Sequence, residues 1–88
     1  MSSQPAGAPA SAPVVVLEYL ARQIVDDPDA VRVEVEETSN GMALRLHVGP
    51  DDMGKVIGKR GRVAQSVRTI VRAAAAREGV GVFVDIVD

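Results

Sequence analysis

The spacing of apolar residues changes several times along the chain, and each change predicts a new element. Between residues 14 and 26 the apolar side chains recur at intervals of three and four, as on one face of an amphipathic helix: Val16, Leu17, Leu20, Ala21, Ile24 and Val25. This helix should end near Asp26 or Asp27, because Pro28 disfavours the helical conformation of the residue before it and has no N–H to donate.

Two strands are predicted next, because the apolar residues then alternate with polar ones. The first run contains Val31, Val33 and Val35, and the second contains Leu44, Leu46 and Val48. Between them stands Asn40-Gly41, the preferred centre of a two-residue turn, since both positions of that turn need a positive φ. We therefore expect a hairpin in which Ser39 pairs with Met42.

This turn sets the register of the hairpin. Counting outward places the following residues opposite one another: Val33 and Val48, Val35 and Leu46, Glu34 and His47, and Glu36 and Arg45. Apolar residues then share one face, while acidic and basic residues meet on the other, as a half-buried hairpin requires.

The remainder of the chain predicts two helices and a last strand. Pro50-Asp51-Asp52 suits the start of a short helix that reaches about Ile57, and the paired acids are explained by the positive end of the helix dipole. Residues 62–77 predict a longer helix, closed by Gly79. Its core stripe is expected to be Val63, Val67, Ile70, Val71 and Ala74, with Arg62, Gln65, Arg68 and Arg72 turned away. Residues 80–87 alternate and predict a strand.

The resulting order is α-β-β-α-α-β. It predicts an α+β fold in which a three-stranded sheet carries its helices on one face. Residues 1–13, MSSQPAGAPASAP, offer no charge and nothing large to bury, so we interpret them as a disordered tail before a single domain at residues 14–88.

The amino-acid composition limits the kinds of functional site that the chain can form. The 88 residues include no cysteine and one histidine, so no disulfide, metal site or cofactor is expected. The sequence does not indicate a catalytic nucleophile close to a general base, so we do not expect the protein to be an enzyme. The chain also has no apolar run long enough to span a bilayer and no signal-peptide pattern, which favours a cytoplasmic protein with no membrane partner.

Charge is divided unevenly along the chain. The net charge is −2, yet residues 54–77 contain no acid and seven basic residues: Lys55, Lys59, Arg60, Arg62, Arg68, Arg72 and Arg77. A local positive region of this kind suits a polyanion. The three arginines at 68, 72 and 77 are most simply explained as solvated residues on an outer helix face. His47 is expected on the polar face of its strand, beside Glu34.

A loop between two glycines carries the strongest local signal, in the run Val56-Ile57-Gly58-Lys59-Arg60-Gly61. Glycines let a ligand approach the backbone, the following helix offers its positive end, and two cations add full charge. Nucleotide-binding motifs do not fit, because G-x-x-x-G-K-R at residues 54–60 is one residue short of a P-loop and ends without a hydroxyl.

This G-x-x-G loop, placed between two helices in an α-β-β-α-α-β order, resembles the KH domain in its type II arrangement. The segments VDDPDAVRV (25–33), PDDMGKVIGKRGRVA (50–64) and RTIVRAAA (68–75) are similar to the small stand-alone bacterial RNA-binding proteins of the KhpA type. The resemblance covers residues 14–88.

The resemblance implies a groove for single-stranded RNA. Gly58 and Gly61 would admit the sugar-phosphate chain, Lys59 and Arg60 would contact phosphates, Lys55 and Arg62 would extend the positive rim, and Ile57 and Val63 would form an apolar floor. Tyr19 and Phe83, the only aromatic residues, are expected to pack rather than stack on bases, so binding should be weakly sequence-specific and sensitive to salt.

The same resemblance implies a role as a small RNA chaperone or regulator linked to cell-envelope growth and cell shape. It also implies a homodimer and a partnership with a KhpB-type KH protein. The sequence is also compatible with two other classes of protein: a helix-turn-helix that binds duplex DNA, and a KH-fold interaction subunit that does not bind RNA.

Overall fold

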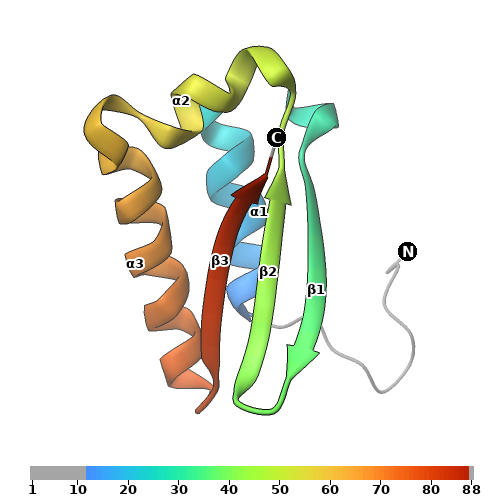
Figure 1. Cartoon of the computed structure of the whole chain (residues 1–88), viewed down its shortest axis with the longest axis vertical. Coiled ribbons are helices and arrows are strands. Elements are labelled where there is room, and N and C mark those ends of the chain that lie inside the picture. The colour runs from blue at the N-terminus through green and yellow to red at the C-terminus, as the bar shows by residue number, and fades with distance from the viewer. Residues whose placement is uncertain (1–11, 88) are drawn as a thin grey trace.

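The computed structural model describes residues 12–87, and it confirms the predicted order of elements (Figure 1). They are α1 (Ala12–Ile24), β1 (Arg32–Thr38), β2 (Gly41–His47), α2 (Met53–Ile57), α3 (Arg62–Arg77) and β3 (Gly81–Val87). Short 3₁₀ turns occupy residues 28–30, 50–52 and 59–61. Helix α1 begins two residues before the expected position, and Pro13, assigned to the tail by its composition, is buried. The remainder of that predicted tail, residues 1–11, lies outside the described residues.

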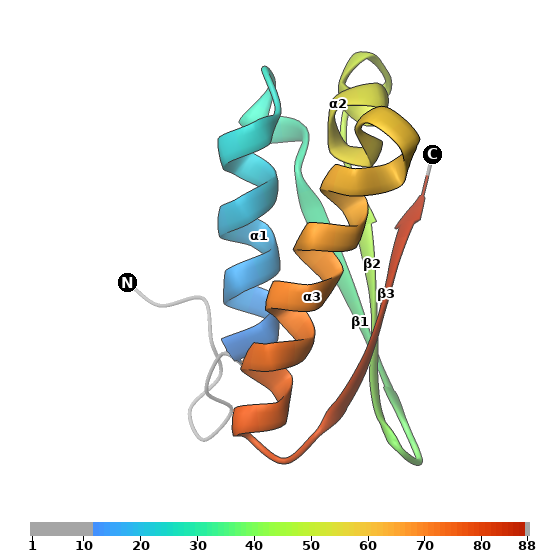
Figure 2. The same cartoon turned by 90° about the vertical axis from the view of Figure 1, so that its left-hand side faces the viewer.

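The three strands form one sheet in the order β1-β2-β3. β1 and β2 are antiparallel, whereas β2 and β3 are parallel and are joined through α2 and α3. The helices pack on one face of the sheet, as predicted, and the other face is open (Figure 2). β1 and β3 are the edge strands.

The predicted hairpin register is wrong by two residues. Thr38 pairs with Gly41, so Ser39 and Asn40 form the turn, and Val35 lies opposite Leu44. Gly41 has a φ of 148°, and a Cβ there would lie within 2.9 Å of the Gly81 nitrogen. The glycine therefore serves the close approach of β2 to β3 rather than the turn. An even shift keeps every side chain on its expected face.

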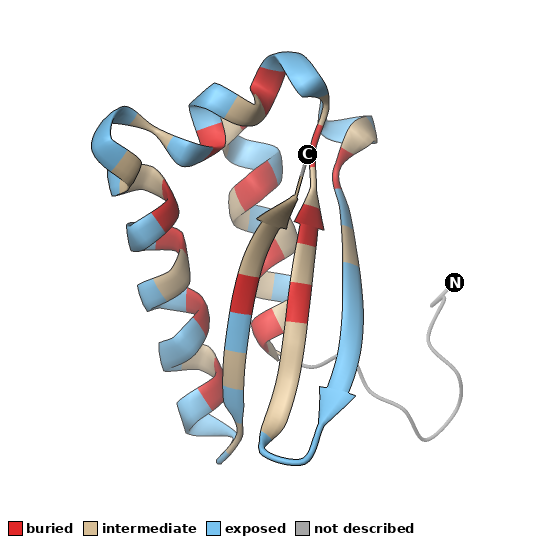
Figure 3. Ribbon diagram, viewed as in Figure 1, coloured by how far each residue is buried: buried red, intermediate tan, exposed pale blue. Residues whose placement is uncertain are grey.

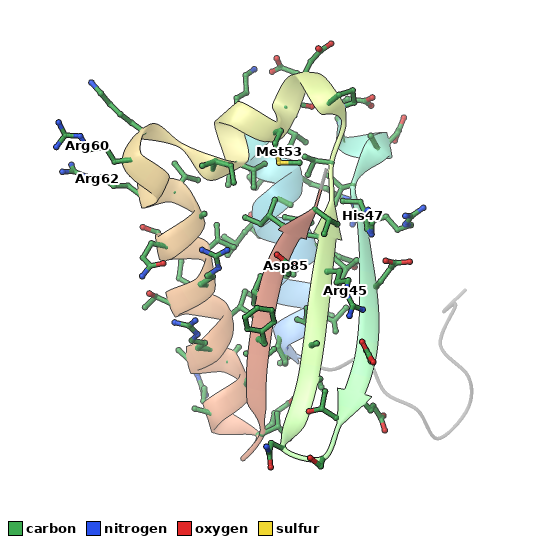
Figure 4. The ribbon with its side chains drawn as sticks, in the orientation of Figure 1. Arg45, His47, Met53, Arg60, Arg62 and Asp85 are labelled. Carbon is green, nitrogen blue, oxygen red and sulfur yellow. The ribbon has the colours of Figure 1, made fainter. Side chains whose placement is uncertain are left out.

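Acidic and basic side chains do meet on the open face of the sheet, but diagonally. Arg45 Nη2 lies 2.7 Å from Glu36 Oε1, and His47 Nε2 lies 2.7 Å from Glu34 Oε1. Figure 4 shows Arg45, His47 and Asp85 on this face. The predicted proximity of His47 and Glu34 is confirmed, although their backbones are not directly opposite. The hydrogen bond from His47 lowers the pKa of Glu34.

The core lies between the helices and the sheet (Figure 3). Buried apolar side chains come from all three α-helices, from β2 and β3, and from the segments that connect the elements: Leu17, Ala21, Val25, Val31, Leu44, Leu46, Val48, Val56, Ala64, Val67, Val71, Ala75 and Val84. The predicted stripe of α1 is confirmed. In α3 the buried stripe is centred on Val67 and Val71, which leaves Ile70 at its margin and 48% exposed, contrary to prediction.

Helix α3 ends at Arg77, two residues before the glycine that the sequence indicates. Gly79 has a φ of 74°, and the N–H of Val80 reaches back to the Ala75 carbonyl at 3.1 Å. This closes the helix and turns the chain into β3. Within residues 12–87, no helix combines the length and the apolar character needed to cross a membrane.

Candidate nucleic-acid interface

The loop between α2 and α3 is built on left-handed backbone. Gly58 ends α2 with a φ of 76°, and its N–H donates to the Gly54 carbonyl at 2.8 Å. Gly61 precedes α3 with a φ of 72°, and its N–H donates to the Gly58 carbonyl at 3.2 Å. The sequence-predicted loop thus closes on itself as a tight turn between two helices.

The two glycines are needed for different reasons. A Cβ at Gly58 would lie 2.6 Å from Val63 Cβ, because the half-buried side chain of Val63 packs directly against this backbone. A Cβ at Gly61 would meet nothing within 4 Å. Glycine is therefore needed at position 58 both for its positive φ and for close packing against Val63. At position 61 it is needed only for its positive φ, and the space around it is open to a ligand.

Arg60 also takes a left-handed conformation, with a φ of 58° and a ψ of 26°. A residue with a Cβ rarely does so, and such strain is concentrated at functional sites. Figure 4 shows the Arg60 and Arg62 side chains projecting away from the body of the molecule. Lys59 is exposed as well.

The start of α3 adds a further positive feature. The helix is 16 residues long, and among the described residues no side chain caps its N-terminus. Its dipole places partial positive charge at Gly61 and Arg62, beside the cations of the loop. Ile57, which is 36% exposed, supplies an apolar surface next to these charges. Phosphates and the apolar faces of bases could therefore be held side by side.

Lys55 differs from the other predicted site residues because it already has an anionic partner. Its Nζ forms an ion pair with Asp26, just after α1, and the hydrogen bond from this contact raises the pKa of Lys55. The structure thus brings Lys59, Arg60 and Arg62 to the exposed loop, and holds Lys55 at the neighbouring corner.

Asp52 has a role that sequence reasoning missed. Its side chain is 3% exposed, and its two carboxylate oxygens accept the N–H groups of Asp26 and Asp27 at 3.1 Å each. Asp51 and Asp52 lie in the 3₁₀ turn that leads into α2, where helix-start charge is expected, and Asp52 forms no side-chain hydrogen bond to the N-terminus of α2. Asp52 instead ties the end of α1 to the start of α2. Its partners are 25 and 26 residues away, so no local pattern indicates them.

Arg68 also departs from its predicted position. Its Nε donates to the Val84 carbonyl at 3.1 Å, so the side chain crosses from α3 to the edge strand β3 instead of turning away. The guanidinium places positive charge between α3 and the outer edge of the sheet. Arg72 lies one helical turn further along the same side of α3 and is exposed, as expected.

The aromatic residues are not packed in the core. Tyr19 on α1 is 62% exposed and Phe83 on β3 is 61% exposed, which contradicts the expectation that they pack. Phe83 is on the open sheet face, where alternation along β3 places Val84 toward the helices and Phe83 away from them. Neither ring belongs to α2, α3 or the loop between them. Within residues 12–87, no three acidic or histidine side chains gather in a way that could hold a metal ion.

Comparison with known proteins places this geometry in a family. The family model described as "KhpA/KhpB, KH domain" matches residues 15–86. A protein named RNA-binding protein KhpA from Streptomyces coelicolor is 49% identical over 72 residues, which cover 82% of this chain and 87% of that protein. The protein of the same name from Mycobacterium tuberculosis is 48% identical over 75 residues, covering 85% and 90%. That from Clostridium acetobutylicum is 46% identical over 72 residues, covering 82% and 96%.

Solved structures agree on the fold. A crystal structure of Era in complex with MgGDPNP and nucleotides 1506–1542 of 16S ribosomal RNA superposes with a TM-score of 0.60 at 14% identity. A point variant of Aquifex aeolicus Era bound to GDP·AlF4⁻ gives 0.58 at 13% identity. Each comparison covers 98% of this chain but only 35% of the Era chain. The fold is that of a type II KH domain, and the chain belongs to the KhpA/KhpB KH-domain family.

Proposed function

We propose that this protein binds single-stranded RNA through residues 58–61 and the start of α3. The observation that carries the proposal is the loop itself: two glycines at φ values of 76° and 72° enclose two exposed cations beside an uncapped helix N-terminus. The relatives at 46–49% identity are named RNA-binding proteins, which supports the same ligand.

Each site residue has a role in this proposal. Gly58 and Gly61 let the sugar-phosphate chain approach the backbone, and Lys59 and Arg60 neutralise its phosphates. Arg62 extends the positive rim, and Lys55 can join it when it leaves its ion pair with Asp26. Bases rest against Ile57 and the exposed part of Val63.

Binding should be weakly sequence-specific. No aromatic side chain stands at the loop, and base–aromatic stacking, worth about 1–3 kcal/mol per base, is therefore absent there. Phosphate contacts dominate, so affinity should fall steeply as salt rises. These properties suit a small RNA chaperone or regulator without a catalytic step, acting in the cytoplasm, where such RNA is made.

The proposal is tested by fluorescence anisotropy of a labelled single-stranded RNA with the wild-type protein and the Lys59→Asp/Arg60→Asp variant. Both positions are exposed and neither side chain forms an ion pair with another described residue, so the variant should remain folded by circular dichroism. We expect wild-type binding that weakens with salt and a variant that loses most of its affinity.

A matched control distinguishes the effect of losing the two loop cations from the effect of a change in net charge. Arg22→Asp/Arg32→Asp changes the net charge by the same amount at exposed positions in the last turn of α1 and on β1. It should retain most of the affinity. Equal losses in both variants, or preference for duplex DNA over single-stranded RNA, would contradict the proposal.

We also propose self-association and association with a KhpB-type KH protein. An apolar hollow of about 560 Å³ lies between α1 and α3, lined by Ala12, Val16, Ile70, Ala73, Ala74, Arg77 and Glu78. Exposed Ile70 can be buried there by a second copy, while Arg77 and Glu78 offer complementary charges at the rim. Analytical ultracentrifugation of the full chain tests the homodimer, and a monomer at high concentration would exclude it.

A further inference from the structure

An exposed ion pair joins α2 to the segment that follows α1. Lys55 Nζ contacts Asp26 Oδ2, and the two side chains are 46% and 79% exposed. The contact stabilises the charged form of Lys55, whose pKa is raised first by the hydrogen bond to Asp26. The ammonium is therefore at the surface, but its charge is balanced by a carboxylate of the same chain.

The backbone of Asp26 is held in place for this contact. Its N–H donates to Asp52 Oδ1 at 3.1 Å, and Asp52 is almost completely buried. The neighbouring N–H of Asp27 donates to the other oxygen of the same carboxylate. The buried carboxylate of Asp52 thus holds two consecutive backbone N–H groups, those of Asp26 and Asp27. The Asp26 side chain is therefore kept within reach of α2.

Lys55 is also within reach of a ligand at the loop. It lies three residues before Gly58, and three residues of α-helix span about 4.5 Å. A lysine side chain is long and flexible, so the same ammonium can meet either Asp26 or a phosphate bound at the loop. Exposed ion pairs are weak, and exchange of one anion for the other is feasible.

We propose that Asp26 is a positioning residue that holds Lys55 away from bound RNA and thereby lowers the affinity of the loop. The inference rests on the proposed function, because it concerns the same ligand at the same loop. RNA and Asp26 compete for one cation. Loss of the Asp26 charge should give the RNA one more phosphate contact.

The test uses Asp26→Asn in the full chain, which removes the carboxylate but keeps the backbone N–H bound by Asp52. Affinity for a labelled single-stranded oligouridine is measured by anisotropy across a salt series. We expect binding about two- to fivefold tighter at low salt, the gain expected from one exposed ion pair. The slope of log affinity against log salt should also steepen by about 0.7, the value for one additional phosphate contact on a single strand.

Two controls separate this effect from a change in net charge. Asp29→Asn removes an exposed acid from the 3₁₀ turn at residues 28–30, where Asp29 forms no ion pair with another described residue. It should leave the slope unchanged. Adding Lys55→Gln to Asp26→Asn should abolish the gain, and Asp26→Glu should keep affinity near the wild-type value.

Three results would overturn the inference: no gain in Asp26→Asn, the same gain and slope in Asp29→Asn, or a gain that persists without Lys55. Each of these can occur while the wild type binds RNA, so the proposed function would stand. Absence of binding by the wild type and all variants would instead overturn the proposed function, and the inference with it.

Discussion

At the scale of single residues, the loop depends on backbone conformations that most side chains avoid. Gly58, Arg60 and Gly61 all have positive φ values, at 76°, 58° and 72°. Two of them are glycines, which adopt this region without strain, and the third is an arginine that adopts it at a cost. If residues 58–61 bind RNA as proposed, this strain at Arg60 is the cost of directing its cation toward the ligand.

Alanine substitutions at the two loop glycines should have unequal effects on stability. Gly58→Ala adds strain at a φ of 76° and a clash with Val63, and should lower the free energy of unfolding by about 2–4 kcal/mol. Gly61→Ala adds the strain alone, because its Cβ would meet open space, and should cost about 1 kcal/mol. Urea denaturation followed by circular dichroism measures both. Equal losses would show that Val63 does not pack against Gly58 as described.

The loop could be predicted at this scale because its signal is local. Glycines, cations and a following helix are adjacent in the sequence, and their physical effects do not depend on distant residues. Asp52 and Lys55 could not be predicted in the same way. Their partners lie 25 to 29 residues away, and nothing near them in the chain indicates a buried clamp or an ion pair.

At the scale of elements, alternation and helical spacing predicted each helix and strand, while their exact alignment depended on tertiary contacts. The hairpin illustrates this. Asn40-Gly41 has a strong intrinsic preference for a turn centre, yet Gly41 is used where β2 approaches Gly81 of β3. Ile70 is a similar case, because its spacing fits the core stripe of α3 but α1 leaves a hollow beside it. Packing between elements therefore determines both the position of the hairpin turn and the exposure of Ile70.

The diagonal pair on the open sheet face predicts a pH dependence. His47 lowers the pKa of Glu34 from its ordinary value of 4.5, so the pair stabilises the fold above that pH. The stabilisation should be lost as the pH falls through the lowered pKa and Glu34 becomes protonated. In His47→Ala the pKa of Glu34 should rise back toward 4.5.

Carboxyl carbon NMR titration of Glu34 measures this shift directly. High salt should reduce it, since the Glu34 side chain is 52% exposed. An unchanged Glu34 pKa in His47→Ala would show that the hydrogen bond to His47 is not the cause.

At the scale of the whole molecule, the positive loop and the acidic strand lie apart. Figure 1 shows the α2–α3 junction at one upper corner and β1 along the opposite edge of the sheet. β1 carries Glu34, Glu36 and Glu37, while residues 54–77 contain no acid. A net charge of −2 is therefore compatible with a polyanionic ligand, which is attracted at one corner and repelled at the other edge. The acidic edge also discourages strand pairing with other chains.

Single-stranded RNA is proposed to bind at residues 58–61 and the start of α3. Amide chemical-shift mapping by NMR, with unlabelled single-stranded oligouridine added to the isotope-labelled full chain, tests this proposal most directly. We predict that the largest shifts fall on Gly58, Lys59, Arg60, Gly61 and Arg62, and that they diminish together as salt is raised. Shifts confined to the open sheet face or to the hollow between α1 and α3, with the loop unchanged, would contradict the account.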